Sequence, residues 1–212
     1  DINEIFGILT SNAREPFDMY EIIIRLIDDS AFHEFKRNYG TTIITGFARI
    51  MGYKVGIIAN NGILFNESSL KATHFIELCN HRGIPIVFLQ NINGFIVGKM
   101  HEHKGIARDG AKFVHAVANA SVPKFTVIVG GSFGAGNYAM AGRAYDPELL
   151  FMWPTARIGV MGGEQAAKVL STVKLQQVEK SGKQLSKEEV EAIEEKILKK
   201  YSEESSAFYS SS

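Results

Sequence analysis

Short apolar runs rich in β-branched residues alternate with amphipathic segments along most of this chain. The runs have the length and composition of strands, whereas the amphipathic segments repeat their apolar positions at the spacing of a helix. The predicted strands lie at residues 42–50, 54–59, 86–90, 123–129 and 149–153. The predicted helices lie at residues 16–27, 32–35, 68–81 and 109–120 and, after a glycine-rich turn, up to about residue 143. This alternation predicts an α/β fold with a mostly parallel sheet and flanking helices.

The pattern changes after residue 170. Residues 171–200 are rich in Lys, Glu and Gln, and they predict a pair of exposed helices. The second of these begins at Ser186–Glu189, where a serine is followed by a glutamate in a capping-box pattern. Residues beyond this pair predict a tail without a strand. We therefore expect a core, residues 1–170, and a helical extension with a truncated tail, residues 171–212, within the same domain.

The composition is that of an ordinary globular protein, with 45% apolar and 22% charged residues. Lys and Arg number 23, as do Asp and Glu, so the charge pattern does not indicate a nucleic-acid partner. The apolar runs are shorter than the roughly 20 residues of a membrane span, so we expect an interior compartment and no membrane partner. The lone cysteine, Cys79, lies in an apolar helical pattern and is expected in the core. The chain begins at Asp1, which indicates a fragment or a processed piece.

The segment Gly130–Asn137 follows a predicted buried strand and carries the strongest indication of chemistry. Its glycines allow a tight turn and leave the backbone bare to a ligand. The N–H groups at the start of the following helix suit an anion, or an oxyanion that forms during a reaction. The segment lacks the lysine of a phosphate-binding loop and the glycine spacing of a dinucleotide fingerprint. Close packing of a helix on a strand, without chemistry, is the alternative interpretation.

A second loop, Asn91–Gly98, follows the predicted strand at residues 86–90. In parallel sheets, ligand sites lie outside the carboxyl ends of the strands. Both loops follow buried strands that are consecutive along the chain, so we expect the loops to be neighbours. Side by side, they would offer backbone donors to one oxygen from two directions.

The side chains with catalytic potential have simpler explanations. His101 and His103 are too close in sequence to set up a tetrahedral site without distant ligands, so we expect a solvated loop and no metal. Glu67, Asp109 and Glu164 are possible acids, but each stands near a predicted helix start, where the macrodipole favours a negative charge. The sequence thus offers backbone donors and no convincing side-chain base. This combination favours an enolate intermediate whose proton is taken by a bound cofactor.

Several longer segments resemble one family. They are Tyr39–Arg49, Gly56–Gly62, Phe88–Phe95, Gly130–Tyr138 and Met161–Ala167. Together they resemble the carboxyltransferase (β) subunit of biotin-dependent acyl-CoA carboxylases. Within that family, Gln90–Phe95 and Gly134–Tyr138 are more similar to 3-methylcrotonyl-CoA carboxylases than to propionyl-CoA carboxylases.

The resemblance implies a crotonase-like ββα-spiral fold and only the carboxyl-terminal domain of a two-domain subunit. The amino-terminal domain, which holds most of the acyl-CoA site in the family, would be missing, so the isolated chain is expected to be inactive. The implied partners are an acyl-CoA substrate, a biotin-carrying α subunit and further copies in a homo-oligomer. The implied location is the bacterial cytoplasm or the mitochondrial matrix.

The resemblance also implies a biotin site. Its residues would be Gly94, Phe95, Gly134, Ala135, Gly136, Asn137 and Tyr138. The N–H groups of Gly134, Ala135 and Gly136 would form an oxyanion hole for the ureido oxygen of biotin. Carboxybiotin would release CO₂, its nitrogen would take a proton from 3-methylcrotonyl-CoA, and the resulting dienolate would attack CO₂. Valine at Ala135 or Gly136 is expected to abolish transfer while the fold persists.

Three other functions remain open at this point. A biotin-dependent decarboxylase subunit would run related chemistry backwards and feed a membrane sodium pump. A non-catalytic module would bind biotin or assemble partners without turnover. A stand-alone crotonase-like hydratase or isomerase would need a carboxylate base within this chain, for which Glu67 and Glu164 are the candidates.

Overall fold

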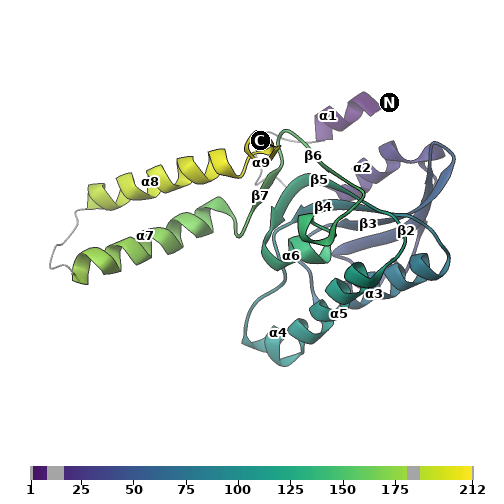
Figure 1. Cartoon of the computed structure of the whole chain (residues 1–212), viewed down its shortest axis with the longest axis horizontal. Helices are drawn as coiled ribbons and strands as arrows, with labels where there is room; N and C mark the ends of the chain where they lie inside the picture. The colour runs from purple at the N-terminus through teal and green to yellow at the C-terminus, as the bar shows by residue number, and fades with distance from the viewer. Residues whose placement is uncertain (1, 9–16, 181–186, 212) are drawn as a thin grey trace.

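The computed structural model describes residues 2–8, 17–180 and 187–211. Its described strands form one sheet in the order β1-β2-β3-β4-β5-β6, and β7 pairs with the far end of β5 (Figure 1). They are β1 (His33–Glu34), β2 (Ile43–Ile50), β3 (Tyr53–Asn60), β4 (Ile86–Ile92), β5 (Lys124–Phe133), β6 (Leu149–Met152) and β7 (Arg157–Gly159). The β1–β2 and β2–β3 pairs are antiparallel, and the other pairs are parallel. The predicted α/β fold with a mostly parallel sheet is therefore confirmed.

Helices cover both faces of this sheet. α3 (Asn66–His81) and α5 (Ile106–Asn119) pack together on one face, and α2 (Met19–Leu26) packs on the other (Figure 1). The shorter helices are η1 (Ile2–Glu4), α1 (Ile5–Ile8), η2 (Asp28–Ser30), α4 (Lys99–His103), α6 (Gly134–Ala139) and η3 (Arg143–Tyr145). α3 connects β3 to β4 and α5 connects β4 to β5, so the predicted helices between strands are confirmed.

The central strands bury both of their faces. Ile43 and Ile58 contribute to the core under α3 and α5, whereas Ile44 and Ile57 contribute to the core under α2. Neighbouring residues of one strand thus enter opposite cores, as the two-residue period of a strand requires. Full burial of such a side chain contributes about 1.5–3 kcal/mol. The strand ends that carry the candidate loops are consequently held by packing on both sides.

Two long helices leave the body of the fold. α7 (Gly163–Lys180) and α8 (Lys187–Glu204) run side by side and away from the sheet (Figure 1). They confirm the predicted helix pair. Because α7 begins before residue 171, the expected division of the chain at that point falls inside a helix. The expected capping box begins at Ser186, which lies outside the described residues.

The chain returns to the sheet after α8. The backbone carbonyl of Ser205 accepts a hydrogen bond from the N–H of Ile158 in β7, at 3.0 Å. Ser206 forms an isolated antiparallel bridge with Arg157. α9 (Ala207–Ser211) follows, so the expected tail is largely helical and is anchored to β7.

One predicted helix is wrong. Residues 32–35 contain β1, and the N–H of Phe35 donates to the carbonyl of Thr45 at 2.7 Å. A four-residue helix fixes several dihedral angles for one hydrogen bond, so it forms only where its surroundings support it, and here they support a strand. Gly46 also makes room for the ring of Phe32, which a Cβ at that position would meet. Strand pairing and this ring contact outweigh the local apolar spacing.

Other boundaries shift for local reasons. α2 begins at Met19 instead of residue 16, because the Asp18 side chain caps it by accepting a backbone hydrogen bond. α6 ends at Ala139 instead of near residue 143, because Ala141 has a left-handed φ of 52°. β7 lies in the segment where we expected only an extended loop.

Candidate functional site

The glycine-rich segment places the start of α6 at the carboxyl end of β5. β5 continues through the first two glycines to Phe133, and α6 begins at once at Gly134. Gly134 has a φ of 57°, a left-handed conformation that glycine adopts without steric cost. The N–H groups of Gly134, Ala135 and Gly136 form the first turn, where a helix leaves its donors without intrahelical partners. The predicted succession of strand, turn and helix is confirmed, with a longer strand and a shorter helix.

This first turn is not capped by a side chain of its own N-cap residue. Phe133 occupies the N-cap position and makes no side-chain capping hydrogen bond within the described chain. Ser, Thr, Asn or Asp would usually fill that role. Ala135 in the same turn is exposed. The turn can therefore present backbone donors to a negatively charged group from outside.

The loop after β4 lies directly beside this turn. A Cβ added to Gly136 would stand 2.5 Å from Cγ1 of Ile92 and 3.3 Å from Cα of Gly94, so a side chain at Gly136 would force the loops apart. Gly94 has a φ of 125°, and a Cβ added there would meet nothing within 4 Å among the described residues. The two loops are therefore neighbours, as predicted, and the space at Gly94 is open.

The other predicted site residues are placed differently from one another. The ring of Phe95 turns toward α5, where its Cε1 lies 3.1 Å from the position of a Cβ on Gly110, and it packs against the core. Tyr138 is exposed. The side chain of Asn137 turns inward to a hydrogen bond with β5. A group bound beside the first turn of α6 and the loop after β4 would thus meet the backbone of Phe95 and Asn137 and the side chain of Tyr138.

A buried polar network that the sequence patterns did not reveal lies beneath α6. Asn137 Nδ2 donates to Ser132 Oγ at 2.5 Å, and Ser132 Oγ donates to Gln90 Oε1 at 2.5 Å. Gln90 Nε2 donates to the backbone carbonyl of Met140, the C-cap of α6, at 2.6 Å. Gln90 and Ser132 are fully buried. The available signal was a long polar side chain, Gln90, at the end of an apolar strand, because buried polar groups need partners.

A second set of amides joins the ends of β3, β4 and β5. Asn91 N–H donates to Asn60 Oδ1, and Asn60 Nδ2 donates to the Asn91 carbonyl, both at 2.8 Å. Asn91 Oδ1 accepts from the N–H of Gly131 at 3.1 Å. The register of β4 and β5 shifts here, and the Asn91 side chain occupies the place that a Cβ on Gly130 would need. This bulge separates the part of β5 that pairs with β6 from the part that pairs with β7.

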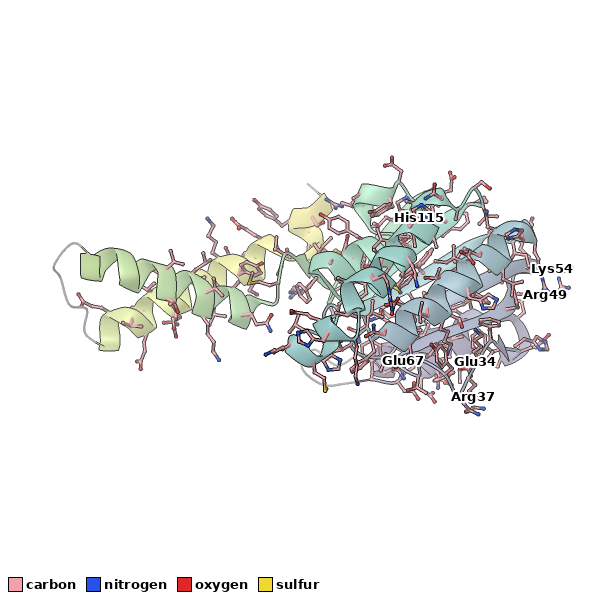
Figure 2. The ribbon with its side chains drawn as sticks, turned by 90° about the horizontal axis from the view of Figure 1, so that it is seen from below. Glu34, Arg37, Arg49, Lys54, Glu67 and His115 are labelled. Atoms are coloured by element: carbon pink, nitrogen blue, oxygen red, sulfur yellow. The ribbon has the colours of Figure 1, made fainter. Side chains whose placement is uncertain are left out.

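The acidic residues considered from the sequence lie at helix starts. Glu67 is exposed in the first turn of α3 (Figure 2). Asp109 is buried in the first turn of α5, 3.1 Å from Arg108 Nε and 3.2 Å from Lys112 Nζ. The hydrogen bond from Arg108 is the main cause that lowers the pKa of Asp109 to about 2, although burial acts in the opposite direction. Glu164 falls in the first turn of α7.

The histidines and the cysteine have structural surroundings. His101 and His103 lie in α4, so the expected loop is a short helix, and the His101 ring contacts that of Phe65. Among the residues that the structure describes, no three His, Cys, Asp or Glu side chains are grouped as metal ligands. Cys79 is fully buried in the core, as predicted, and burial raises the pKa of its thiol to about 12.

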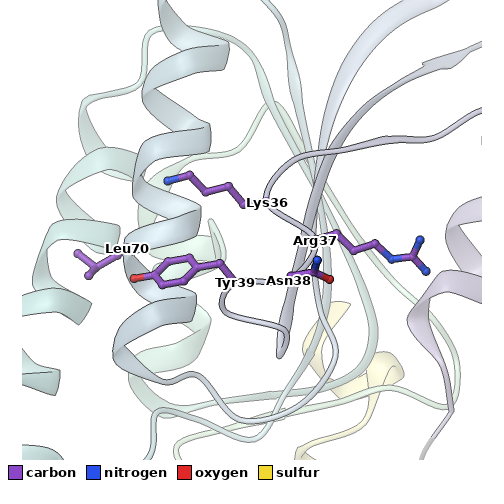
Figure 3. A pocket seen from close by; sticks show the side chains of 5 residues that line it. All are labelled: Lys36, Arg37, Asn38, Tyr39 and Leu70. Carbon is purple, nitrogen blue, oxygen red and sulfur yellow. The ribbon is translucent and has the colours of Figure 1, made fainter.

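A surface hollow lies near β1, which is at the far edge of the sheet from β5. It is lined by the segment Lys36–Tyr39 and by Leu70 of α3 (Figure 3). The four side chains of the segment are exposed, and Lys36 Nζ lies 3.0 Å from His74 Nδ1. The hollow is therefore separate from the turn of α6. Within the described parts of the chain, no helix has both the length and the apolar character needed to cross a membrane.

The chain matches the carboxyl transferase domain family over residues 1–212. It is 59% identical over 209 residues to the mitochondrial methylcrotonoyl-CoA carboxylase beta chain of Dictyostelium discoideum. It is 54% identical over 207 residues to the biotin-dependent 3-methylcrotonyl-coenzyme A carboxylase beta1 subunit of Mycobacterium tuberculosis. These matches cover 99% and 98% of this chain but only 36% and 39% of the relatives. The chain thus spans little more than a third of their length.

Solved structures are similar over the whole described fold. The beta subunit of P. aeruginosa geranyl-CoA carboxylase is 40% identical with a TM-score of 0.87, covering 98% of this chain and 39% of that chain. Transcarboxylase 12S with methylmalonyl-coenzyme A and methylmalonic acid bound is 30% identical with a TM-score of 0.89, covering 100% and 41%. These neighbours are crotonase-like carboxyltransferases, which confirms the predicted fold class. By its sequence and its fold, the chain belongs to the carboxyl transferase domain family.

Proposed function

We propose that this chain is the carboxyl-terminal part of a carboxyltransferase β subunit that moves a carboxyl group from biotin to 3-methylcrotonyl-CoA. The substrate assignment is supported by the identity of 54–59% to methylcrotonoyl-CoA carboxylase beta chains. The observation that carries the site is the first turn of α6, whose backbone donors adjoin the open space at Gly94.

The residues at this turn suit a flat ring with a polar oxygen. Glycines keep the two loops in contact on one side and leave open space on the other, so a ring could approach the backbone without meeting side chains. We assign the N–H groups of Gly134, Ala135 and Gly136 to the ureido oxygen of biotin. The walls would come from Gly94, from the backbone of Phe95 and Asn137, and from the exposed side chain of Tyr138.

The chain contributes mainly backbone electrostatics to this reaction. Biotin, when bound, supplies the carboxyl group and the nitrogen base that the transfer requires. The donors of α6 are held in place before the reaction, so they stabilise negative charge on the oxygen without reorganising. Loss of one such donor costs about 3–4 kcal/mol in other enzymes. Asp109 is already paired with Arg108 and Lys112 at the start of α5, which fits a reaction whose base is not this side chain.

The partners belong to the same proposal, since the relatives extend well beyond the length of this chain. We assign the biotin to a partner α subunit. We assign most acyl-CoA contacts to an amino-terminal domain of the same β subunit, and the assembly to a homo-oligomer. The compartment would be the bacterial cytoplasm or the mitochondrial matrix.

The test uses the complete β subunit assembled with a biotin-carrying partner. Carboxylation that depends on ATP and bicarbonate is measured with 3-methylcrotonyl-CoA, geranyl-CoA and propionyl-CoA. We expect the highest kcat/KM with 3-methylcrotonyl-CoA. A preference for another acyl-CoA would overturn the substrate assignment, and carboxylation of none would overturn the function. Decarboxylation without ATP use would indicate the decarboxylase instead.

A further inference from the structure

We propose that Gln90 and Ser132 are positioning residues, which aim the donors of α6 through a relay that also includes Asn137. This inference rests on the proposed function, because it gives the buried network a role in the same site. Gln90 and Ser132 lie below the turn, fully buried, and would act through the helix without touching the substrate.

The relay holds α6 at two points from a single side chain, at Asn137 within the helix and at its C-cap, Met140. Gln90 binds the Met140 carbonyl at the carboxyl end of α6 directly, through its amide nitrogen. Through its amide oxygen and Ser132, it also holds Asn137, the residue that follows the three proposed donors. Gln90 itself is fixed in β4, which both cores hold, so the relay ties the helix to the most rigid part of the fold.

A neighbouring hydrogen bond restrains the chain just after α6. Thr126 Oγ1 donates to the carbonyl of Ala141 at 2.7 Å, and both residues are fully buried. The N–H of Gly142 donates to the carbonyl of Asn137 at 2.9 Å. A helix of six residues is too short to hold its own orientation in water, so its direction must come from such contacts.

The network has little tolerance for loss of one member. Within the described residues, every buried side-chain nitrogen and oxygen has a hydrogen-bond partner. Removing the hydroxyl of Ser132 would take a hydrogen-bond partner from both Gln90 Oε1 and Asn137 Nδ2. Loss of the partner of a buried polar group costs free energy of folding. The helix would move to recover partners, and donor misplacement by about 1 Å can cost about 100-fold in rate.

The experiment compares Ser132→Ala with the matched control Thr45→Val in the complete, assembled enzyme. Thr45 is also fully buried and donates one hydrogen bond, to the carbonyl of Phe35 at 3.0 Å, but it lies in β2. We expect Ser132→Ala to lower kcat by about 10- to 100-fold while KM for the acyl-CoA changes less than about twofold. Hydrogen exchange should become faster at the amides of α6. Thr45→Val should retain the wild-type kcat and the wild-type exchange at α6.

A second variant tests whether the residues act as one unit. Gln90→Met keeps a similar volume and removes both hydrogen bonds of the amide. We expect a loss of kcat similar to that of Ser132→Ala. The double variant should lose no more than the more impaired single variant, because both changes break one relay. Additive losses would overturn the relay. If Ser132→Ala does not fold, the kcat and exchange of Gln90→Met decide alone.

The outcomes separate this inference from the proposed function. If the wild-type enzyme is active and Ser132→Ala behaves like Thr45→Val in kcat and exchange, the relay has no positioning role and the proposed function stands. If the wild-type enzyme carboxylates no acyl-CoA, the proposed function is wrong, and the role of the relay in it is wrong as well.

Discussion

Ala135 and Gly136 are adjacent, yet the structure gives a substitution at each a different consequence. Ala135 is exposed, so a larger side chain there crowds the space in front of the first turn of α6 without disturbing the core. Gly136 faces Ile92 and the backbone of Gly94, and neither can move without shifting the second loop. We therefore keep the expectation that valine preserves the fold for Ala135 and withdraw it for Gly136.

The first residue-scale prediction concerns these two positions. Ala135→Val should lower carboxyl transfer by about 100-fold or more, because it shields one donor, while the melting temperature stays near that of the wild type. Gly136→Val should lose activity and also melt at a lower temperature. Gly7→Val is the control, since a Cβ at Gly7 meets nothing within 4 Å among the described residues. Full activity of Ala135→Val would remove the site assignment.

The second residue-scale prediction concerns Asp109. Its pKa is about 2 in the folded chain and ordinarily 3.8, so the unfolded chain binds its proton more readily. The ionised carboxylate therefore stabilises the fold above about pH 4, and this contribution is lost as the pH falls toward about 2. Asp109→Asn should cost about 1–3 kcal/mol at neutral pH.

Thermal unfolding of wild type and Asp109→Asn across this pH range measures the effect. The gap between their melting temperatures should narrow as the solution is acidified. Glu67→Gln is the control, because Glu67 is also an acid in a first helical turn but is exposed. A gap that stays constant down to about pH 2 would contradict the role given to the Asp109 charge.

At the scale of elements, the sequence predicted what periodicity and apolar runs control. The strands at residues 42–50 and 86–90 are apolar on both faces, and this pattern identifies a buried strand. The sequence pattern did not predict β1 and β7, because they have only two and three residues and depend on their pairing with β2 and β5. A strand that depends on a distant partner leaves no periodic signal of its own.

The element-scale prediction tests the correction at β1. Gly46→Ala places a Cβ against the ring of Phe32 and 2.8 Å from the carbonyl of His33. The added carbon should force β1 away from β2 and cost about 1–3 kcal/mol, as overpacking does. Gly7→Ala, in an open part of α1, should have a small effect of either sign. Equal melting temperatures for both variants would show that β1 contributes little to stability.

At the scale of the whole molecule, the candidate site was partly predictable. The glycine turn and the loop at Asn91–Gly98 could be placed together, because both follow neighbouring parallel strands. The relay from Gln90 could not, since Ser132 and Asn137 become its partners only when β4, β5 and α6 have packed. Side-chain hydrogen bonds between distant segments depend on three-dimensional placement that spacing along the chain does not encode.

The α7–α8 pair joins the body of the fold at β7, through the start of α7 and the end of α8. α7 begins shortly after that strand, and Ser205, just beyond α8, is bonded to Ile158 within it. The Tyr201 hydroxyl of α8 accepts a hydrogen bond from the N–H of Met161 at 3.4 Å. The carbonyl oxygen of the preceding residue, Val160, lies 3.1 Å from the position of a Cβ on Gly134. A molecule that binds α7 and α8 far from β7 and pushes them sideways would consequently transmit force to β7 and Val160, beside the turn to which we assign the oxyanion.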